Sequence, residues 1–225
     1  DKNRAEAIGF TVVDVATVIS THLTELIRRN CYKLIGRQEV SKLLDIFSKK
    51  NPKLVEDLIP SLFSLGELVS LLKNLLFESV PIKDLQSILE TIADNIHKTK
   101  NVDILTEFVR QALSGYITNQ FAVEKTLYVL MLAPKLEELI RQSLRSSDGQ
   151  ITINLPPDKA QAIIQDLTTA VQYFENFGAQ PLLLVAPELR RGIKNYLDRY
   201  IGGYNVMSYN EVSGSVDIKP IATLE

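Results

Sequence analysis

The sequence of 225 residues contains one cysteine, two histidines and no tryptophan. Because Cys31 is alone, no intrachain disulfide can form, which is compatible with a reducing compartment. The histidines, His22 and His97, are far apart in the sequence, and neither an HExxH nor a CxxC motif occurs. We therefore predict no metal site. We interpret His22 as a partly buried helix residue, with partner contact as the alternative, and Cys31 as structural, not nucleophilic.

The sequence also lacks an excess of charge and long apolar runs. Lysine and arginine number 25 against 27 aspartates and glutamates, a net charge of −2, so no basic field for nucleic acid or acidic lipid is expected. The apolar runs at Leu127–Ala133 and Leu182–Ala186 are far shorter than the ~20 residues that span a bilayer, and no signal peptide precedes Gly9. We expect a soluble chain without a nucleic-acid partner.

Motifs for catalysis or cofactor binding are missing as well. Glu137 and Glu138 are neighbours on a predicted helix, so their side chains diverge and do not form an acid–base pair. The predicted strands are followed by APK at Ala133 and APE at Ala186, with no glycine-rich turn for a phosphate. We predict no catalytic residue and no cofactor. A nucleotide-binding enzyme that uses the predicted α/β region is the alternative of another class.

The most informative stretch is Gly9–Leu44. Residues Phe10 to Val13 are aromatic and β-branched, which predicts a short strand, and Asp14 can then cap a long helix. One apolar seam of this helix comprises Val15, Ile19, Leu23 and Leu26, widened by Val18 and Ile27. A neighbouring stripe comprises Thr17, Thr21, Thr24 and Arg28. Small hydroxyls beside Val18 are a poor core face, so this stripe is predicted to be a shallow contact surface.

The next helix is predicted to begin at Gly36, with Glu39 in the position of a capping box. Arg37 places a cation where the helix dipole favours an anion, so helix stability does not explain it. We interpret Arg37 as part of a surface ion pair or, alternatively, as a partner contact.

The remaining chain changes from helical to alternating patterns. From Arg37 to Tyr116, start signals at Asn51, Ser64 and Asn101 predict four or five short helices. Strands are then predicted at Thr126–Leu132, Ile151–Leu155, Leu182–Val185, Val206–Tyr209 and Val216–Thr223. The last of these is predicted to lie at the edge of the sheet, because it contains Pro220. Helices are predicted at Lys135–Leu144, Asp158–Phe177 and Glu188–Tyr200. This pattern predicts an α+β fold that is mostly helical, a helical-bundle subdomain followed by a small α/β subdomain with a mainly parallel sheet. Three divisions are predicted. Residues 1–35 are a strand and a long helix that remain from earlier subdomains, residues 36–115 are the helical subdomain, and residues 116–225 are the α/β subdomain.

Several motifs occur in a fixed order through the first half of the chain: THL (Thr21–Leu23), GRQEV (Gly36–Val40), LLD (Leu43–Asp45), PKLVEDLIP (Pro52–Pro60), ILET (Ile88–Thr91) and LTEFVRQAL (Leu105–Leu113). In this order they resemble the cytoplasmic domain of the FHIPEP family, the export gates of flagellar and virulence type III secretion systems. Virulence members usually carry an apolar residue where Arg37 stands, so the flagellar branch is favoured and the virulence branch is the alternative. Val15 departs from the proline of many members.

The resemblance implies a docking platform, not an enzyme. It implies binding of flagellar export chaperones with bound substrates, contact with other export-apparatus proteins including the soluble ATPase complex, and a homo-nonameric ring below the export pore. The full-length protein is then expected in the cell inner membrane, with this part on the cytoplasmic side. The chaperone site is implied at the positions matching Val13, Val18 and Thr21, and part of it precedes Asp1, so the chain alone is expected to bind chaperones weakly or not at all. From the residues alone, the valines could equally be core residues.

Overall fold

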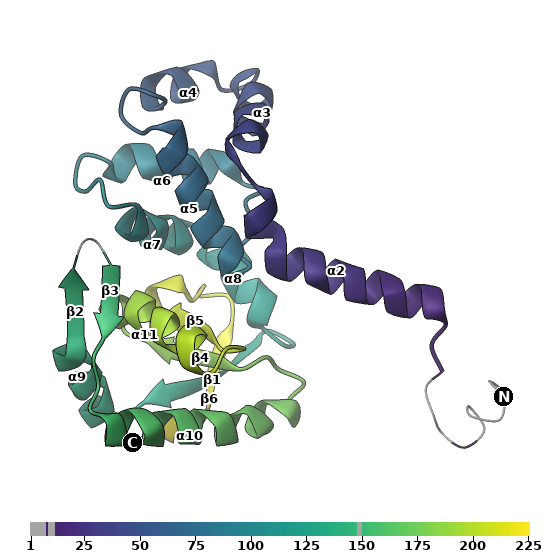
Figure 1. The fold of residues 1–225 in the computed structure, drawn as a ribbon, viewed down its shortest axis with the longest axis vertical. Helices are drawn as coiled ribbons and strands as arrows, with labels where there is room; N and C mark the ends of the chain where they lie inside the picture. The colour runs from purple at the N-terminus through teal and green to yellow at the C-terminus, as the bar shows by residue number, and fades with distance from the viewer. Residues whose placement is uncertain (1–7, 9–11, 148–149) are drawn as a thin grey trace.

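Helix α2 (Val15–Leu34) projects from one side of the body of the molecule, where a group of helices packs above a sheet (Figure 1). The structure is a computed structural model that describes residue 8, residues 12–147 and residues 150–225. The chain forms a mostly helical α+β fold, as the sequence predicts.

The first half of the body consists of helices whose starts match the predicted signals. Asn101 accepts hydrogen bonds from the backbone of Asp103 and Ile104, and Ser64 and Glu67 form a reciprocal capping box. Five of these helices lie in the expected range and a sixth crosses its end: α3 (Arg37–Ser48), α4 (Pro52–Leu58), α5 (Leu65–Phe77), α6 (Leu85–Asn95), α7 (Val102–Ala112) and α8 (Ser114–Phe121).

The apolar faces of these helices form one core. Helix α5 packs against α3 and α7, and α6 packs against α4 and α7. Aliphatic side chains at a spacing of four are fully enclosed, including Leu68, Leu72, Ile88, Ile92, Leu105 and Val109. Each such side chain contributes about 1.5–3 kcal/mol by leaving water, so the short helices depend on each other for stability.

The second half contains a parallel sheet with strand order β5-β4-β1-β6. Its strands are β1 (Thr126–Leu132), β4 (Leu182–Val185), β5 (Asn205–Ser208) and β6 (Asp217–Leu224), and the helices between them are α9 (Pro134–Ser143), α10 (Pro157–Glu175) and α11 (Pro187–Tyr200). Pro220 lies in β6 at the edge of the sheet, and the register with β1 shifts just after it. The predicted edge position is confirmed by the strand order. Its physical reason is that proline has no N–H to donate to a neighbouring strand.

A short hairpin of β2 (Leu144–Ser147) and β3 (Gln150–Ile153) lies against α11. Strand β3 agrees with the predicted extended segment, whereas β2 was not predicted, because its sequence LRSS has no apolar alternation. Residues 148–149, between the two strands, lie outside the described residues. Gly192 of α11 allows the close approach of the hairpin, since a Cβ there would lie 2.6 Å from Leu144 Cδ2 and 3.2 Å from Ile151 Cγ2.

One predicted element needs correction. Val12 and Val13 lie in irregular chain and not in the predicted strand, while residues 10–11 lie outside the described residues. An extended segment needs the backbone of a neighbouring strand, and the described part of the chain offers none there. The division into 1–35, 36–115 and 116–225 stays a prediction; α8 runs across its second boundary.

Candidate docking surface

Helix α2 begins at an aspartate cap. The backbone N–H of Thr17 donates to Asp14 Oδ1 at 3.0 Å, and the Thr17 hydroxyl donates to Oδ2 at 2.6 Å. These bonds, the hydroxyl bond first, favour the charged carboxylate and lower the pKa of Asp14 below its usual value. The predicted cap is confirmed, and it sets the point at which the chain beyond Val13 becomes helical.

The body holds α2 mainly by its C-terminal end, which packs on α5. The ring of Tyr32 meets the ring of Phe77 edge-on with centroids 5.1 Å apart, and Cys31 Sγ lies 3.9 Å from the carbonyl oxygen of Leu76. No residue of α2 is buried. The first turns of the helix are therefore presented to solvent (Figure 1).

The three predicted contact residues are all exposed. Val13 has 48% and Val18 53% of its surface exposed, and Thr21 is exposed as well. Val18 and Thr21 are three residues apart on α2, so the helix brings them to one side. Val13 precedes the cap and is not on this helical stripe. The alternative that these valines serve only as core residues does not hold in this structure.

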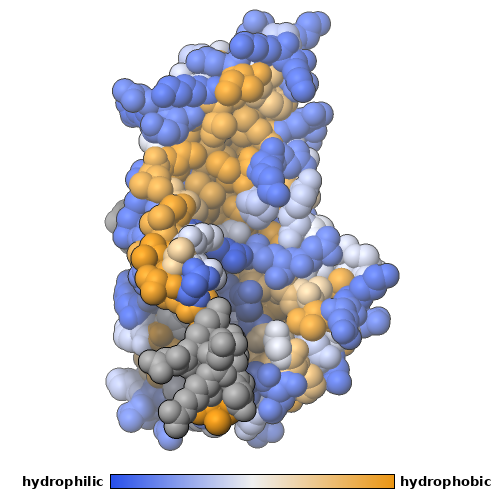
Figure 2. All heavy atoms as spheres, turned by 90° about the vertical axis from the view of Figure 1, so that its right-hand side faces the viewer, coloured by the Kyte–Doolittle hydropathy of each residue, from blue (hydrophilic) through white to orange (hydrophobic). Residues whose placement is uncertain are grey.

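The apolar seam of α2 is also uncovered. Its members are between 45% and 74% exposed: Val15, Ile19, Leu23, Leu26 and Ile27. Figure 2, which looks onto the side from which α2 projects, shows apolar surface running down the helices toward this region. His22 is exposed too, so its predicted partial burial is wrong: the seam beside it is itself exposed. Uncovered apolar surface of this extent is typical of an interaction site.

A cleft of about 460 Å³ lies between α2 and the sheet-containing half of the molecule. Its walls comprise Glu25, Arg28 and Arg29 of α2, then Ser79, Gln120, Gln180, Lys194, Gly203, Tyr204 and Asn205. Arg29 Nε lies 2.6 Å from Glu25 Oε1, and Lys194 Nζ donates to Asp198 at 2.7 Å. The side chain of Arg28 makes no ion pair with the described residues. The cleft is therefore polar, with more cations than anions on its walls.

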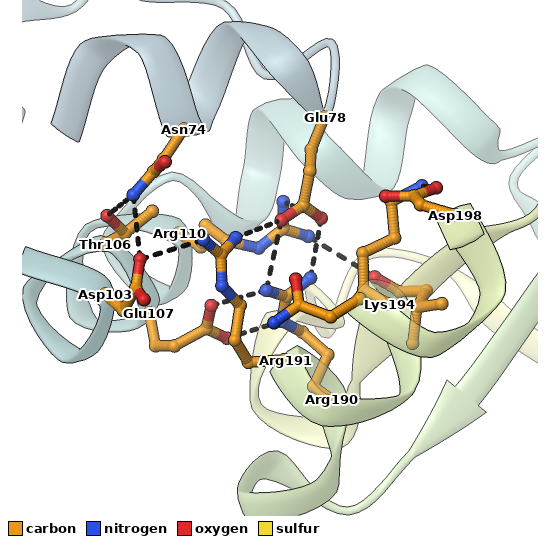
Figure 3. A network of polar contacts seen from close by, with 12 residues as sticks. Asn74, Glu78, Asp103, Thr106, Glu107, Arg110, Arg190, Arg191, Lys194 and Asp198 are labelled. Atoms are coloured by element: carbon orange, nitrogen blue, oxygen red, sulfur yellow. Dashed lines mark hydrogen bonds and ion pairs between the residues drawn. The ribbon is translucent and has the colours of Figure 1, made fainter. Parts of the chain in front are cut away.

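Beneath this surface, a buried ion network joins the two halves of the body (Figure 3). Glu78 directly follows α5 and forms ion pairs with three arginines. The N–O distances are 3.1 Å to Arg110 of α7, 2.6 Å to Arg190 of α11 and 3.1 Å to Arg191 of α11. Each arginine has a second acidic partner, respectively Glu211, Glu107 and Asp103. The side chains of Glu78, Arg110 and Arg190 are at most 4% exposed. Glu78 is thus the shared centre of three ion pairs, of which those with Arg110 and Arg190 are buried and that with Arg191 is partly buried.

Glu78 stays charged because its partners outweigh its burial. Burial alone would raise the pKa of Glu78, but Arg110 and then Arg190 hold that pKa well below its usual value. The pKa of Arg190 lies well above its usual value: burial would lower it, but Glu78 and Glu107 prevail. All these titratable groups are occupied with each other, so the network is suited to fixing the two halves together and not to proton transfer.

The sequence did not reveal this network. Thr106 and Arg110 are buried polar residues of α7 and lie beside its apolar seam. The one signal in the sequence was Arg110, a cation at a position that faces the core. Its partners Glu78 and Glu211 are 32 and 101 positions away in the sequence, so spacing could not identify them.

The sheet offers little for a nucleotide. Each helix that follows a strand, α9, α10 and α11, has proline in its first turn, which removes one of the N–H groups that phosphate would bind. Within the described ranges, no three His, Cys, Asp or Glu side chains are grouped as metal ligands. Nor does any helix there have the length and apolar character needed to cross a membrane.

A sequence model described as the FHIPEP family matches residues 1–217. Flagellar biosynthesis protein FlhA of Bacillus subtilis is 36% identical over 225 residues, covering 100% of this chain and 33% of that protein. The chain therefore spans about a third of the length of this curated relative.

Solved structures share the fold. The Chlamydia pneumoniae CdsV protein superposes with a TM-score of 0.86 at 27% identity, covering 100% of this chain and 64% of that chain. A nonameric EPEC SctV-C superposes with a TM-score of 0.84 at 28% identity, covering 99% and 68%. The whole arrangement of helices and sheet described above is thus similar to that of these proteins.

Proposed function

Because this chain belongs to the FHIPEP family, we propose that it forms part of the cytoplasmic docking platform of a flagellar type III protein export gate. The relative named flagellar biosynthesis protein FlhA supports the flagellar assignment. The nonameric assembly of SctV-C supports a ring of nine copies in the longer protein, at the inner membrane below the export pore. Substrates, the soluble ATPase complex and other export components reach the gate at this platform.

Export chaperones with bound substrates dock on the side of α2 that carries Val18 and Thr21, with Val13 at its margin. The observation that supports this most directly is the exposure of that side: no described residue covers it. Shallow apolar and hydroxyl surface on a rigid helix suits a partner that binds and leaves repeatedly, because few groups must be desolvated.

The role is docking without catalysis. The buried titratable groups are paired with each other, and the helices after the strands begin with proline, so neither a nucleophile–base pair nor a nucleotide site is supported. The virulence secretion homologue is the second candidate, supported by the similarity to CdsV and SctV-C. The identities, 36% with the flagellar relative against 27% and 28% with these two, favour the flagellar branch.

The substitution Thr21→Lys tests the docking site in a protein that carries the whole cytoplasmic region. We expect chaperone affinity to fall by about tenfold or more, because a long charged side chain would stand in the shallow contact. The unfolding temperature should stay nearly unchanged, since Thr21 is exposed and lysine is a good helix former. Isothermal titration calorimetry with a purified chaperone–substrate complex measures the affinity.

The matched control is Ser20→Lys, which adds the same charge to the same helix but about 100° around its axis. Ser20 is exposed, so this variant should bind like the wild type. Unchanged affinity of Thr21→Lys would refute the assigned site, and equal losses in both variants would indicate a general charge effect.

A further inference from the structure

We propose that the docking surface continues from Thr21 into the cleft beside α2, and that an acidic segment of the docked protein binds in this cleft. This inference rests on the proposed function. The cleft is the 460 Å³ hollow whose α2 wall comprises Glu25, Arg28 and Arg29. The partner therefore combines an apolar contact at Val18 with carboxylates a short distance away.

Helix geometry connects the two places. Thr21, Glu25 and Arg28 follow each other at spacings of four and three, so they lie on one side of α2. Seven residues of helix rise about 10 Å, so Arg28 lies about that far along α2 from Thr21. A segment that contacts Val18 and Thr21 reaches Arg28 within two helical turns of its own.

The charges of the cleft favour an acidic occupant. Arg28, Arg29 and Lys194 line it against the single carboxylate of Glu25, although the whole chain carries a net charge of −2. Arg29 shares its charge with Glu25, and Lys194 with Asp198, so Arg28 is the cation that remains without an ion pair among the described residues. A guanidinium binds a carboxylate through two parallel hydrogen bonds, and such bonds are stronger than neutral ones.

The neutral part of the cleft favours a peptide over a small ion or a nucleic acid. Gln120, Gln180 and Asn205 add side-chain amides, which can both donate to and accept from a peptide backbone. A hollow of about 460 Å³ holds several side chains, far more than a single anion needs. A nucleic acid would bring a row of phosphates, whereas Arg28 is the single cation of the cleft without an ion pair among the described residues.

Charge reversal at Arg28 tests the inference. In a protein with the whole cytoplasmic region, Arg28→Glu should weaken binding of a purified chaperone–substrate complex by about tenfold at low salt. The wild-type affinity should fall as the salt concentration rises from about 0.05 to 0.3 M, and Arg28→Glu should flatten this dependence, because salt screens exposed charges beyond about 10 Å. Lys42→Glu, at an exposed position of α3, is the matched control and should bind like the wild type.

The outcomes separate this inference from the proposed function. If Thr21→Lys loses binding while Arg28→Glu behaves like Lys42→Glu, only the acidic-segment inference is overturned. If Thr21→Lys binds normally, the docking site itself is wrong. A photo-cross-linking residue at Gln120 should label a segment of the partner rich in Asp and Glu; labelling of another part of the same protein would overturn the inference.

Discussion

Replacing Glu78 with glutamine should lower the free energy of unfolding by about 3–5 kcal/mol, the usual cost of breaking a buried ion pair by removing one partner. The two side chains have the same size, so the loss reports charge and not a cavity. Without the carboxylate, Arg110, Arg190 and Arg191 would face each other across a buried space with one acidic partner each. Urea unfolding followed by circular dichroism measures the change.

The control for Glu78→Gln is Glu137→Gln on the surface. Glu137 pairs with Arg141 at 3.0 Å, and the two side chains are partly exposed, 22% for Glu137 and 40% for Arg141. Exposed pairs contribute about 0–1 kcal/mol, so this variant should unfold almost like the wild type. Similar small losses in both variants would show that the network around Glu78 does not hold the two halves together.

The same substitution should change how stability depends on pH. The arginines hold the pKa of Glu78 well below its usual value despite burial, and an unfolded glutamate titrates near about 4.3. The stabilisation by Glu78 is therefore complete above about pH 4.3 and is lost as pH falls toward the folded pKa. The stability difference between wild type and Glu78→Gln should shrink when urea unfolding is repeated from about pH 6 down to pH 3. A difference that stays constant over this range would contradict the assignment.

Replacing Gly192 with leucine should lower the free energy of unfolding by about 3 kcal/mol, at the upper end for overpacking. A Cβ at Gly192 would lie 2.6 Å from the side chain of Leu144, 3.2 Å from that of Ile151 and 3.4 Å from that of Ile153, so these side chains must shift. The further bulk of a leucine is expected to push the β2–β3 hairpin away from α11. Exposure of the hairpin backbone, measured by hydrogen exchange, should rise along with the loss in urea unfolding.

Gly115→Leu is the matched control, because nothing lies within 4 Å of a Cβ at Gly115 in α8. There the change should be neutral or stabilising by up to about 1 kcal/mol, since leucine favours helix more than glycine does. A Gly192→Leu protein as stable as the wild type would show that the hairpin adapts without cost.

Local patterns predicted most of the elements. The continuous apolar run of β1 and the caps at Asp14, Ser64 and Asn101 depend on neighbouring residues, and the structure confirms them. The buried ion network could not be predicted in this way, because its pairs join residues up to 113 positions apart. Hairpin strand β2 was missed because its pairing with β3, and not its own sequence, makes it extended.

The proposed docking surface was predictable only in part. Helical periodicity places Val18 and Thr21 on one side of α2, and both are exposed, but it also suggested burial of His22. The prediction failed there because burial depends on what packs against a helix. The cleft could not be predicted either, since its second wall comes from Lys194, Gln180 and Asn205, far from α2 in the sequence.

The one-ended attachment of α2 makes it a lever. Its 20 residues are about 30 Å long, and the Tyr32–Phe77 contact lies close to the end that the body holds. Rotation by about 10° at the Ile35–Gly36 break would displace the far end by about 5 Å while every hydrogen bond inside the helix stays intact. Small adjustments at this break would therefore change the direction in which α2 presents the exposed side chains of Val18 and Thr21.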